Sequence, residues 1–291
     1  MKCATFNILH GRPVRAGRPV PLPDAAAQEL LAGAFASLDA DIVALQEVDR
    51  FQDRSGRVDH AAVAARVMGA ADWRYASTLH GRAVVGKGWV LDPAEPGLRV
   101  YGPRSGVEAG VPSHGVALVT RLPVRAWYVR RLTAAPVGLP LRVAGRSGLT
   151  FVPDQPRAAL AAVVEGERGP FTVAVVHLSF VPGWNVGQLE AVRRWLAGLP
   201  MPHVLLGDFN LAGPVPWLLL AGAAWGETAR RGGHDSNWRD LARTATYPAH
   251  RPRVQFDHVL AAGVPRDAVR GIGTPLMPVS DHRPLAVELA L

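Results

Sequence analysis

Polar residues that can carry out chemistry stand at the ends of short apolar stretches, inside one, or just before the last. The set consists of Asn7, Gln46, Glu47, His177, Asp208, Asn210, Asp257, Asp281 and His282. Buried strands deliver the side chains at their ends to one rim of a sheet, where α/β proteins tend to place ligands. The pattern therefore indicates one site assembled from segments that are distant in the sequence.

Three of these residues offer hard oxygen ligands: Glu47, Asp281 and Asn7. Such oxygens suit Mg²⁺ or Mn²⁺, which bind few carboxylates and keep several waters. Zinc fits less well, because the sequence lacks a tight cluster of histidines and cysteines. Asp208 and Asn210 are two residues apart on one segment, so both side chains can point into the same site.

A carboxylate–imidazole pair is expected between Asp257 and His282. Such a pair fixes the tautomer of the ring and raises its basicity. With His177 as a second imidazole and Asp208 as a carboxylate base, the set contains the parts needed for attack of water on a phosphoester.

Each residue taken alone also has a simpler interpretation. Asp208 can cap the turn that follows it, Glu47 can be a surface carboxylate, and His177 can be a core histidine. Asp281 before His282-Arg283-Pro284 is compatible with ordinary turn chemistry. Six such coincidences at strand ends are much less expected than one. The set as a whole therefore favours a shared functional site over separate structural roles.

The elements that would position these residues alternate between strand-like and helix-like patterns. Strands are predicted at 5–8, 42–45, 116–119, 124–129, 158–164, 171–176, 204–206, 256–260 and 285–289. Helices are predicted at 25–38 with Asp24 as its cap, at 59–68, and after Asn185 as a cap. The strands at 116–119 and 124–129 flank a short turn and predict a hairpin. The mixture predicts an α/β protein, and without a linker or repeat we expect one domain over 1–291.

The composition narrows the class of protein. The chain has 291 residues, 48% of them hydrophobic, which excludes a wholly disordered chain. No apolar run approaches the roughly 20 residues of a transmembrane helix, and the start of the sequence has no secretory character. Cys3 is the single cysteine, so no internal disulfide can form. We therefore expect a cytoplasmic protein, and a monomer.

The net charge is +8, which permits a polyanionic partner such as a nucleic acid. Only Lys2 and Lys87 are lysines, and the arginines are scattered rather than clustered. A solvated basic surface is therefore the simpler interpretation. The charge permits a phosphate-containing substrate without indicating one.

Seven short segments carry a resemblance to a known family. They are Thr5-Phe6-Asn7-Ile8, Leu45-Gln46-Glu47-Val48, Pro156-Arg157-Ala158-Ala159-Leu160, His177-Leu178-Ser179, Gly207-Asp208-Phe209-Asn210, Phe256-Asp257-His258-Val259 and Ser280-Asp281-His282-Arg283-Pro284. In this order, and over nearly the whole chain, they resemble the endonuclease/exonuclease/phosphatase family. The resemblance implies a four-layer α/β sandwich, with two packed mixed β-sheets flanked by helices.

The resemblance also implies roles for the matching residues. Glu47 would be the principal ligand of Mg²⁺ or Mn²⁺, with Asn7 and Asp281 nearby. Asp208 would orient or deprotonate the attacking water. Asn210 would bind the phosphoryl oxygen, and His177 would act on a phosphate oxygen or the leaving group. His282, paired with Asp257, would stabilise the pentacovalent transition state, and Arg157 would contact the phosphate.

The sequence departs from the family pattern at two places. Val116 stands where the family has a polar asparagine, and His258 stands where it often has a tyrosine. Neither is a core catalytic position, so these departures affect fine substrate contacts rather than activity.

Three functions remain open at this stage. The favoured one is a Mg²⁺-dependent phosphodiesterase or phosphatase that acts on a small or lipid-derived phosphoester. His177 points away from the abasic-site repair branch, which usually lacks it. The alternatives are a non-specific deoxyribonuclease-like nuclease, for which the charge of +8 is the best argument, and an inactive domain that binds phosphorylated partners.

Two stretches rich in Gly, Pro and Arg, 81–112 and 136–156, are predicted as long loops that border the cleft. Surface excursions without a role are the alternative. Within these stretches the candidate substrate contacts are Trp89, Tyr101, Arg142 and Arg146.

Overall fold

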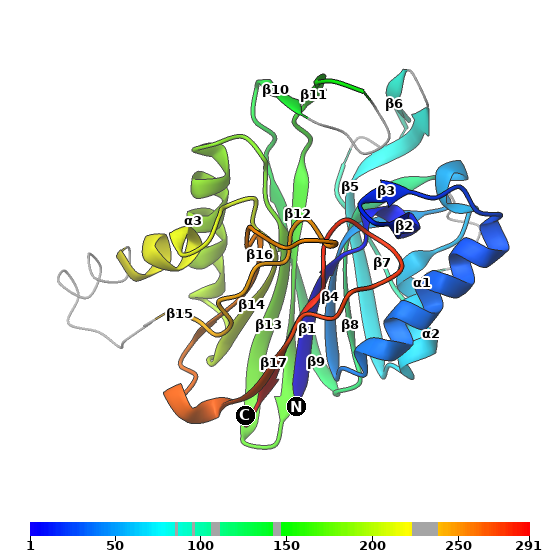
Figure 1. Ribbon diagram of the computed structural model, residues 1–291. Coiled ribbons are helices and arrows are strands. Elements are labelled where there is room, and N and C mark those ends of the chain that lie inside the picture. The colour runs from blue at the N-terminus through cyan, green and yellow to red at the C-terminus, as the bar shows by residue number, and fades with distance from the viewer. Residues whose placement is uncertain (85–86, 95–96, 106–110, 142–146, 223–237) are drawn as a thin grey trace.

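The computed structural model describes the chain except for residues 85–86, 95–96, 106–110, 142–146 and 223–237. Two β-sheets pack face to face, and helices cover their outer faces (Figure 1). The predicted four-layer α/β sandwich is therefore confirmed. Among the described residues, no helix is both long and apolar enough to span a membrane.

The first sheet has the strand order β17-β18-β1-β4-β8-β5-β6, with β7 also paired to β5. Its strands are β1 (Lys2–Asn7), β4 (Ile42–Arg50), β5 (Asp72–Val84), β6 (Gly88–Leu91), β7 (Arg99–Tyr101), β8 (Ser113–Thr120), β17 (Val269–Gly273) and β18 (Leu285–Leu289). β1 and β4 are parallel, whereas their other neighbours are antiparallel, so the sheet is mixed.

The second sheet has the order β15-β16-β14-β13-β12-β9. Its strands are β9 (Val124–Leu132), β12 (Arg157–Gly166), β13 (Gly169–His177), β14 (His203–Asp208), β15 (Arg239–Asp240) and β16 (Asp257–Ala262). β13 and β14 form its parallel pair. Two small ribbons, β2 (Val14–Arg15) with β3 (Arg18–Pro19) and β10 (Gly138–Leu141) with β11 (Thr150–Pro153), stand apart from both sheets.

The alternation of side chains along the central strands produces the layers. In β4, Ala44 packs against the second sheet, whereas Val43 packs toward the helices. In β14, Leu206 faces the interior between the sheets, whereas Leu205 faces the outer helix. Strands buried on both faces read as continuous apolar runs, which is why the sequence pattern located them.

Helices cover the outer faces, and residues 215–222 are helical as well. α1 (Asp24–Leu38) and α2 (His60–Met68) lie on the first sheet, and α3 (Trp184–Leu196) lies on the second. Asp59 caps α2 by accepting a hydrogen bond from the Ala62 N–H at 3.1 Å. Short 3₁₀ turns occur at η1 (Leu9–Gly11), η2 (Asp53–Ser55) and η3 (Arg266–Ala268).

The cap predictions for the other two helices were wrong. α1 already begins at Asp24, after Pro23, and no side chain caps it. Asn185 is the second residue of α3 rather than its cap. Its side-chain amide donates to the Asn210 carbonyl at 3.0 Å, because the helix starts against the loop after β14. A cap residue can be used for such tertiary contacts, which the local sequence does not reveal.

The predicted hairpin at 116–119 and 124–129 was also wrong. β8 belongs to the first sheet and β9 to the second, where it pairs with β12. The turn at 121–123 therefore carries the chain from one sheet to the other. Two consecutive strands with a short turn fit either arrangement, and burial between the sheets decides which one forms.

The stretches predicted as long loops contain regular structure. β5 continues to Val84 and pairs with β6 and β7, and β10 pairs with β11. Tyr101 is not a surface contact: it is 8% exposed and stacks on Tyr75, with ring centres 5.8 Å apart. Trp89 lies in β6, whereas the predictions for Arg142 and Arg146 fall outside the described residues.

Candidate active site

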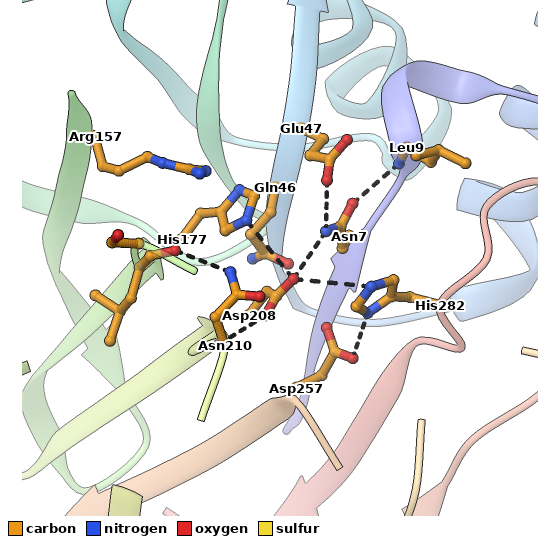
Figure 2. A network of polar contacts seen from close by, with 12 residues as sticks. Asn7, Leu9, Gln46, Glu47, Arg157, His177, Asp208, Asn210, Asp257 and His282 are labelled. Atoms are coloured by element: carbon orange, nitrogen blue, oxygen red, sulfur yellow. Dashed lines mark hydrogen bonds and ion pairs between the residues drawn. The ribbon is translucent and has the colours of Figure 1, made fainter. Parts of the chain in front are cut away.

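The polar residues singled out in the sequence, apart from Asp281, lie close together where strands of both sheets end (Figure 2). Asn7 ends β1, His177 ends β13 and Asp208 ends β14. Strand register aligns them further, because Asp208 stands opposite both His177 and Asp257 in the second sheet. The parallel pairs β1–β4 and β13–β14 therefore bring their carboxyl ends together across the sandwich.

A β-bulge in β4 places Glu47. Gln46 and Glu47 together face the single residue Val116 of β8, so the pairing shifts between Leu45 and Val48. Glu47 has φ +55°, a left-handed conformation that is uncommon for a residue with a side chain. Bulges redirect side chains near sites. Here the bulge turns Glu47 away from the helices that Leu45 and Val48 pack against.

Asp208 is the centre of the polar network. Its Oδ2 accepts a hydrogen bond from Asn7 Nδ2 at 3.0 Å, and its Oδ1 accepts one from the Asn210 N–H at 3.0 Å. His177 Nε2 lies 3.7 Å and His282 Nε2 3.9 Å from Oδ2 (Figure 2). Burial raises the pKa of Asp208 to about 6, although the charge of His282 opposes the rise. A carboxylate with a pKa near neutrality suits proton transfer.

Gly207 allows β14 to approach its neighbour closely at this point. Its φ is +156°, and a Cβ on it would stand 2.0 Å from the Val176 carbonyl oxygen of β13. The absence of a side chain at Gly207 therefore lets the two parallel strands present His177 and Asp208 side by side.

The expected Asp257–His282 pair is present. His282 Nδ1 and Asp257 Oδ2 are 2.8 Å apart, and Thr246 Oγ1 donates to the same oxygen at 2.6 Å. Burial by itself lowers the pKa of His282, but the negative charge of Asp257 and its hydrogen bond, with Asp208 and Asp281, raise it to about 10. His282 is therefore an imidazolium at neutral pH, with Nε2 turned toward Asp208.

On the other side of Asp208, Asn7 connects the two sheets. Its Nδ2 donates to Glu47 Oε1 at 3.1 Å as well as to Asp208, and its Oδ1 accepts from the Leu9 N–H at 3.1 Å. Burial of Glu47 disfavours its charge. The contact with the ring of His10 outweighs this effect and holds the pKa of Glu47 well below its usual range.

Asp281 lies near the same group of charges. Burial raises its pKa, the cation of His282 opposes the rise, and the negative charge of Glu47 adds to it. The neighbouring Ser280 closes the loop onto β1, because its Oγ donates to the Asn7 carbonyl at 2.6 Å. Asp281 thus lies close enough to Glu47 and His282 for their charges to shift its pKa.

Arg157 extends the site along β12. Its Nη2 lies 3.9 Å from Asp154 Oδ1, and its buried Nε has no hydrogen-bond partner among the described residues. Burial and the charge of Arg157 keep the pKa of His177 well below 6.5, so His177 is a neutral ring. A buried guanidinium with an unused N–H can donate a hydrogen bond to a phosphate oxygen.

Sequence reasoning overlooked Asp154, which fixes this region. Its Oδ2 accepts hydrogen bonds from the Ala135 N–H and from Ser179 Oγ, both at 2.7 Å, and its side chain is fully buried. The signal in the sequence that could have identified Asp154 is its position three residues before Arg157. Asn210 is also held in place, since its Nδ2 donates to the Leu178 carbonyl at 3.0 Å.

Two groups of ligands could hold a metal ion. Besides Glu47, Asn7 and Asp281, ligand atoms of Asp208, Asp257 and His282 lie within 4.8 Å of one another. In the second group His282 carries a positive charge and is already bonded to Asp257, which disfavours a cation there. The first group contains the two carboxylates of Glu47 and Asp281 and no such positive charge, which makes it the better fit.

His60 lies behind the site and gives a test of stability against pH. It is 2% exposed, its Nδ1 is 3.4 Å from the Asp49 N–H, and burial lowers its pKa to about 4. The unfolded chain therefore binds a proton between pH 6.5 and 4 that the folded protein does not. We expect the free energy of unfolding to fall by roughly 3 kcal/mol as the pH drops through this window.

The measurement is urea unfolding at several pH values for the wild type and His60→Gln. The expected result is a weaker loss of stability below pH 6.5 in the variant. Equal slopes for the two proteins would contradict the assignment.

The fold and this arrangement of carboxylates, imidazoles and a buried guanidinium define a hydrolase of phosphoesters. The model of the endonuclease/exonuclease/phosphatase family matches residues 4–282, and the chain belongs to this family. A search of curated protein sequences found no match.

Solved structures share the fold at low sequence identity. An endonuclease/exonuclease/phosphatase from Beutenbergia cavernae is 21% identical, with a TM-score of 0.58, and the match covers 100% of this chain and 71% of that one. A mannosyl-6-phosphatase from Bacteroides thetaiotaomicron is 15% identical (TM-score 0.57, 100% of both chains). The human Nocturnin catalytic domain, solved with a bound sulfate anion, is 18% identical (TM-score 0.55, 100% and 94%).

Proposed function

We propose that this protein is a Mg²⁺-dependent phosphomonoesterase or phosphodiesterase that acts on a small-molecule or lipid-derived substrate. The observation that carries the proposal is the position of Asp208, which lies within 4 Å of groups from both sheets: Asn7, His177 and His282. The fold similarity to a mannosyl-6-phosphatase supports a small phosphoester. We also propose that the chain works as one domain, because each sheet supplies part of the site.

The proposed mechanism is in-line attack of water on phosphorus, which breaks the bond from phosphorus to the ester oxygen on the opposite side and releases the alcohol. Asp208 accepts the proton of the attacking water. His282, held as an imidazolium by Asp257, stabilises the negative charge that develops on the phosphoryl oxygens. Arg157 and the amide of Asn210 hold the phosphate, and His177 contacts a phosphate oxygen or the leaving group.

Glu47, Asn7 and Asp281 would hold the divalent cation. When bound, the cation neutralises phosphate charge and acts as a Lewis acid. The bulge at Glu47 and the hydrogen bond of Asn7 to Leu9 keep these ligands in place without it.

The test compares p-nitrophenyl phosphate, bis(p-nitrophenyl) phosphate and plasmid DNA as substrates, each with Mg²⁺, Mn²⁺ or EDTA. We expect turnover of at least one nitrophenyl ester, abolished by EDTA and restored by added Mg²⁺. A preference for plasmid DNA, with activity that falls steeply as salt rises, would indicate the nuclease instead. A folded protein without turnover under any condition would contradict the proposal.

A further inference from the structure

A cavity of about 570 Å³ lies beside Glu47, and no step of the proposed mechanism uses it. Residues of η1, η2, β6 and the start of α1 line it. His10 connects the cavity to the site, because it lines the wall and its Nδ1 lies 3.8 Å from Glu47 Oε2. The volume falls within the range of small-molecule sites, roughly 300–1,000 Å³.

One wall is polar and rigid. Arg54 donates from Nε and Nη2 to both oxygens of Asp49, at 2.8 and 2.7 Å, and Ser55 Oγ donates to the same carboxylate at 3.1 Å. His114 Nδ1 lies 2.7 Å from Asp49 as well. Because the carboxylate of Asp49 compensates the charge of Arg54, we do not expect this wall to bind a second phosphate group.

An aromatic side chain stands against this wall. The Arg54 guanidinium lies 5.2 Å from the ring centre of Trp89, and the His114 ring centre lies 5.6 Å from it. These contacts hold the indole of Trp89 in the lining of the cavity. Aromatic surfaces pack well against the C–H bonds of a saturated ring.

The facing wall offers hydrogen-bonding groups from the first turns of α1. Asp24 and Gln28 both line the cavity, and Gln28 Nε2 donates a weak hydrogen bond to the Gly56 carbonyl at 3.5 Å. A carboxylate accepts hydrogen bonds, an amide donates and accepts, and the hydroxyl oxygen of Ser55, whose proton is directed to Asp49, can accept. This combination matches neighbouring hydroxyl groups, which must donate and accept at once.

We propose that this cavity binds a hydroxylated ring in the alcohol part of the substrate, and hence that the substrates are phosphoesters of cyclic polyols. The ring belongs to a sugar, a cyclitol or the ribose of a nucleotide. The proposal rests on the proposed function, since it places the ring next to the phosphate site. An acyl chain would offer no hydrogen bond to the side chains of Asp24 and Gln28.

The test uses the full chain with Mg²⁺ and four substrates: glucose 6-phosphate, myo-inositol 1-phosphate, AMP and p-nitrophenyl phosphate. The variants are Trp89→Ala, Trp89→Phe and Gln28→Ala, with Glu29→Ala as the matched control on the exposed side of α1. Inorganic phosphate serves as a product inhibitor that reports on the phosphate site alone.

We expect Trp89→Ala and Gln28→Ala to lower kcat/KM for at least one ring phosphate about tenfold, the effect of one lost contact. The same variants should change kcat/KM for p-nitrophenyl phosphate less than threefold and leave the inhibition constant of inorganic phosphate unchanged. Trp89→Phe should recover most of the loss, and Glu29→Ala should match the wild type. The ring phosphate that responds identifies the source of the ring.

Two results would overturn the inference. One is a wild-type enzyme that hydrolyses p-nitrophenyl phosphate but none of the three ring phosphates. The other is equal kcat/KM of Gln28→Ala, Trp89→Ala and Glu29→Ala on every ring phosphate. Neither affects the proposed function, which fails if the wild type has no metal-dependent turnover or prefers plasmid DNA.

Discussion

Replacing Asp208 with asparagine is expected to lower kcat/KM for p-nitrophenyl phosphate by about three orders of magnitude, the scale of a lost general base. Asparagine has nearly the shape of aspartate and can still accept from the Asn210 N–H. It cannot take a proton from water, and its amide would face the Nδ2 of Asn7, which now donates to Asp208. The rate of the chemical step should therefore fall far more than the stability of the fold.

Steady-state kinetics and thermal unfolding of Asp208→Asn would be measured together. Asp39→Asn is the control, because the Asp39 side chain is 79% exposed. A folded Asp208→Asn protein that kept more than a tenth of wild-type activity would exclude Asp208 as the base.

The second large effect is expected at the Asp257–His282 pair. Asp257→Asn and His282→Gln should each lower kcat by about 10²–10⁴-fold, and the double variant should be little worse than His282→Gln alone. The reason is that Asp257 acts through the imidazole, which it orients at 2.8 Å and keeps charged. Removing either member therefore removes the same stabilisation of the transition state.

The pH profile separates this role from a structural one. Because Asp257 helps to raise the pKa of His282 to about 10, the wild type should keep its cation through the neutral range and lose it only as the pH rises further. In Asp257→Asn the loss of activity with rising pH should begin at lower pH. Strictly additive effects of the two substitutions, with an unchanged alkaline limb, would mean that the pair does not act as a unit.

The sequence predicted the central strands and most of the site because both depend on short, strong signals. Asp208 follows an apolar run, and the Ser280-Asp281-His282 segment precedes another. Burial on both faces forces such runs into central strands, and strand register then brings Asp257 opposite Asp208. The pairing of Asp257 with His282 was expected from their chemistry and is observed.

Other features depend on contacts that no local pattern encodes. The bulge that turns Glu47 into the site depends on how β4 pairs with Val116 of β8. The switch of β9 to the second sheet follows from packing between layers, and the use of Asn185 as a donor to Asn210 depends on where α3 docks. Asp154 was overlooked for the same reason, since its partners Ala135 and Ser179 are distant in sequence.

The double hydrogen bond of Asn7 has a consequence for how this enzyme would lose activity. One amide group joins Glu47 of the first sheet to Asp208 of the second, so the alignment of the reacting groups is only as exact as the registration of the two sheets. A cavity made deep in the sandwich, for instance at Leu206 or Val175, lets the sheets shift by fractions of an ångström. Turnover would then depend on the packing of the distant core. It would decline under mild heating or after a core mutation while the secondary structure is still intact.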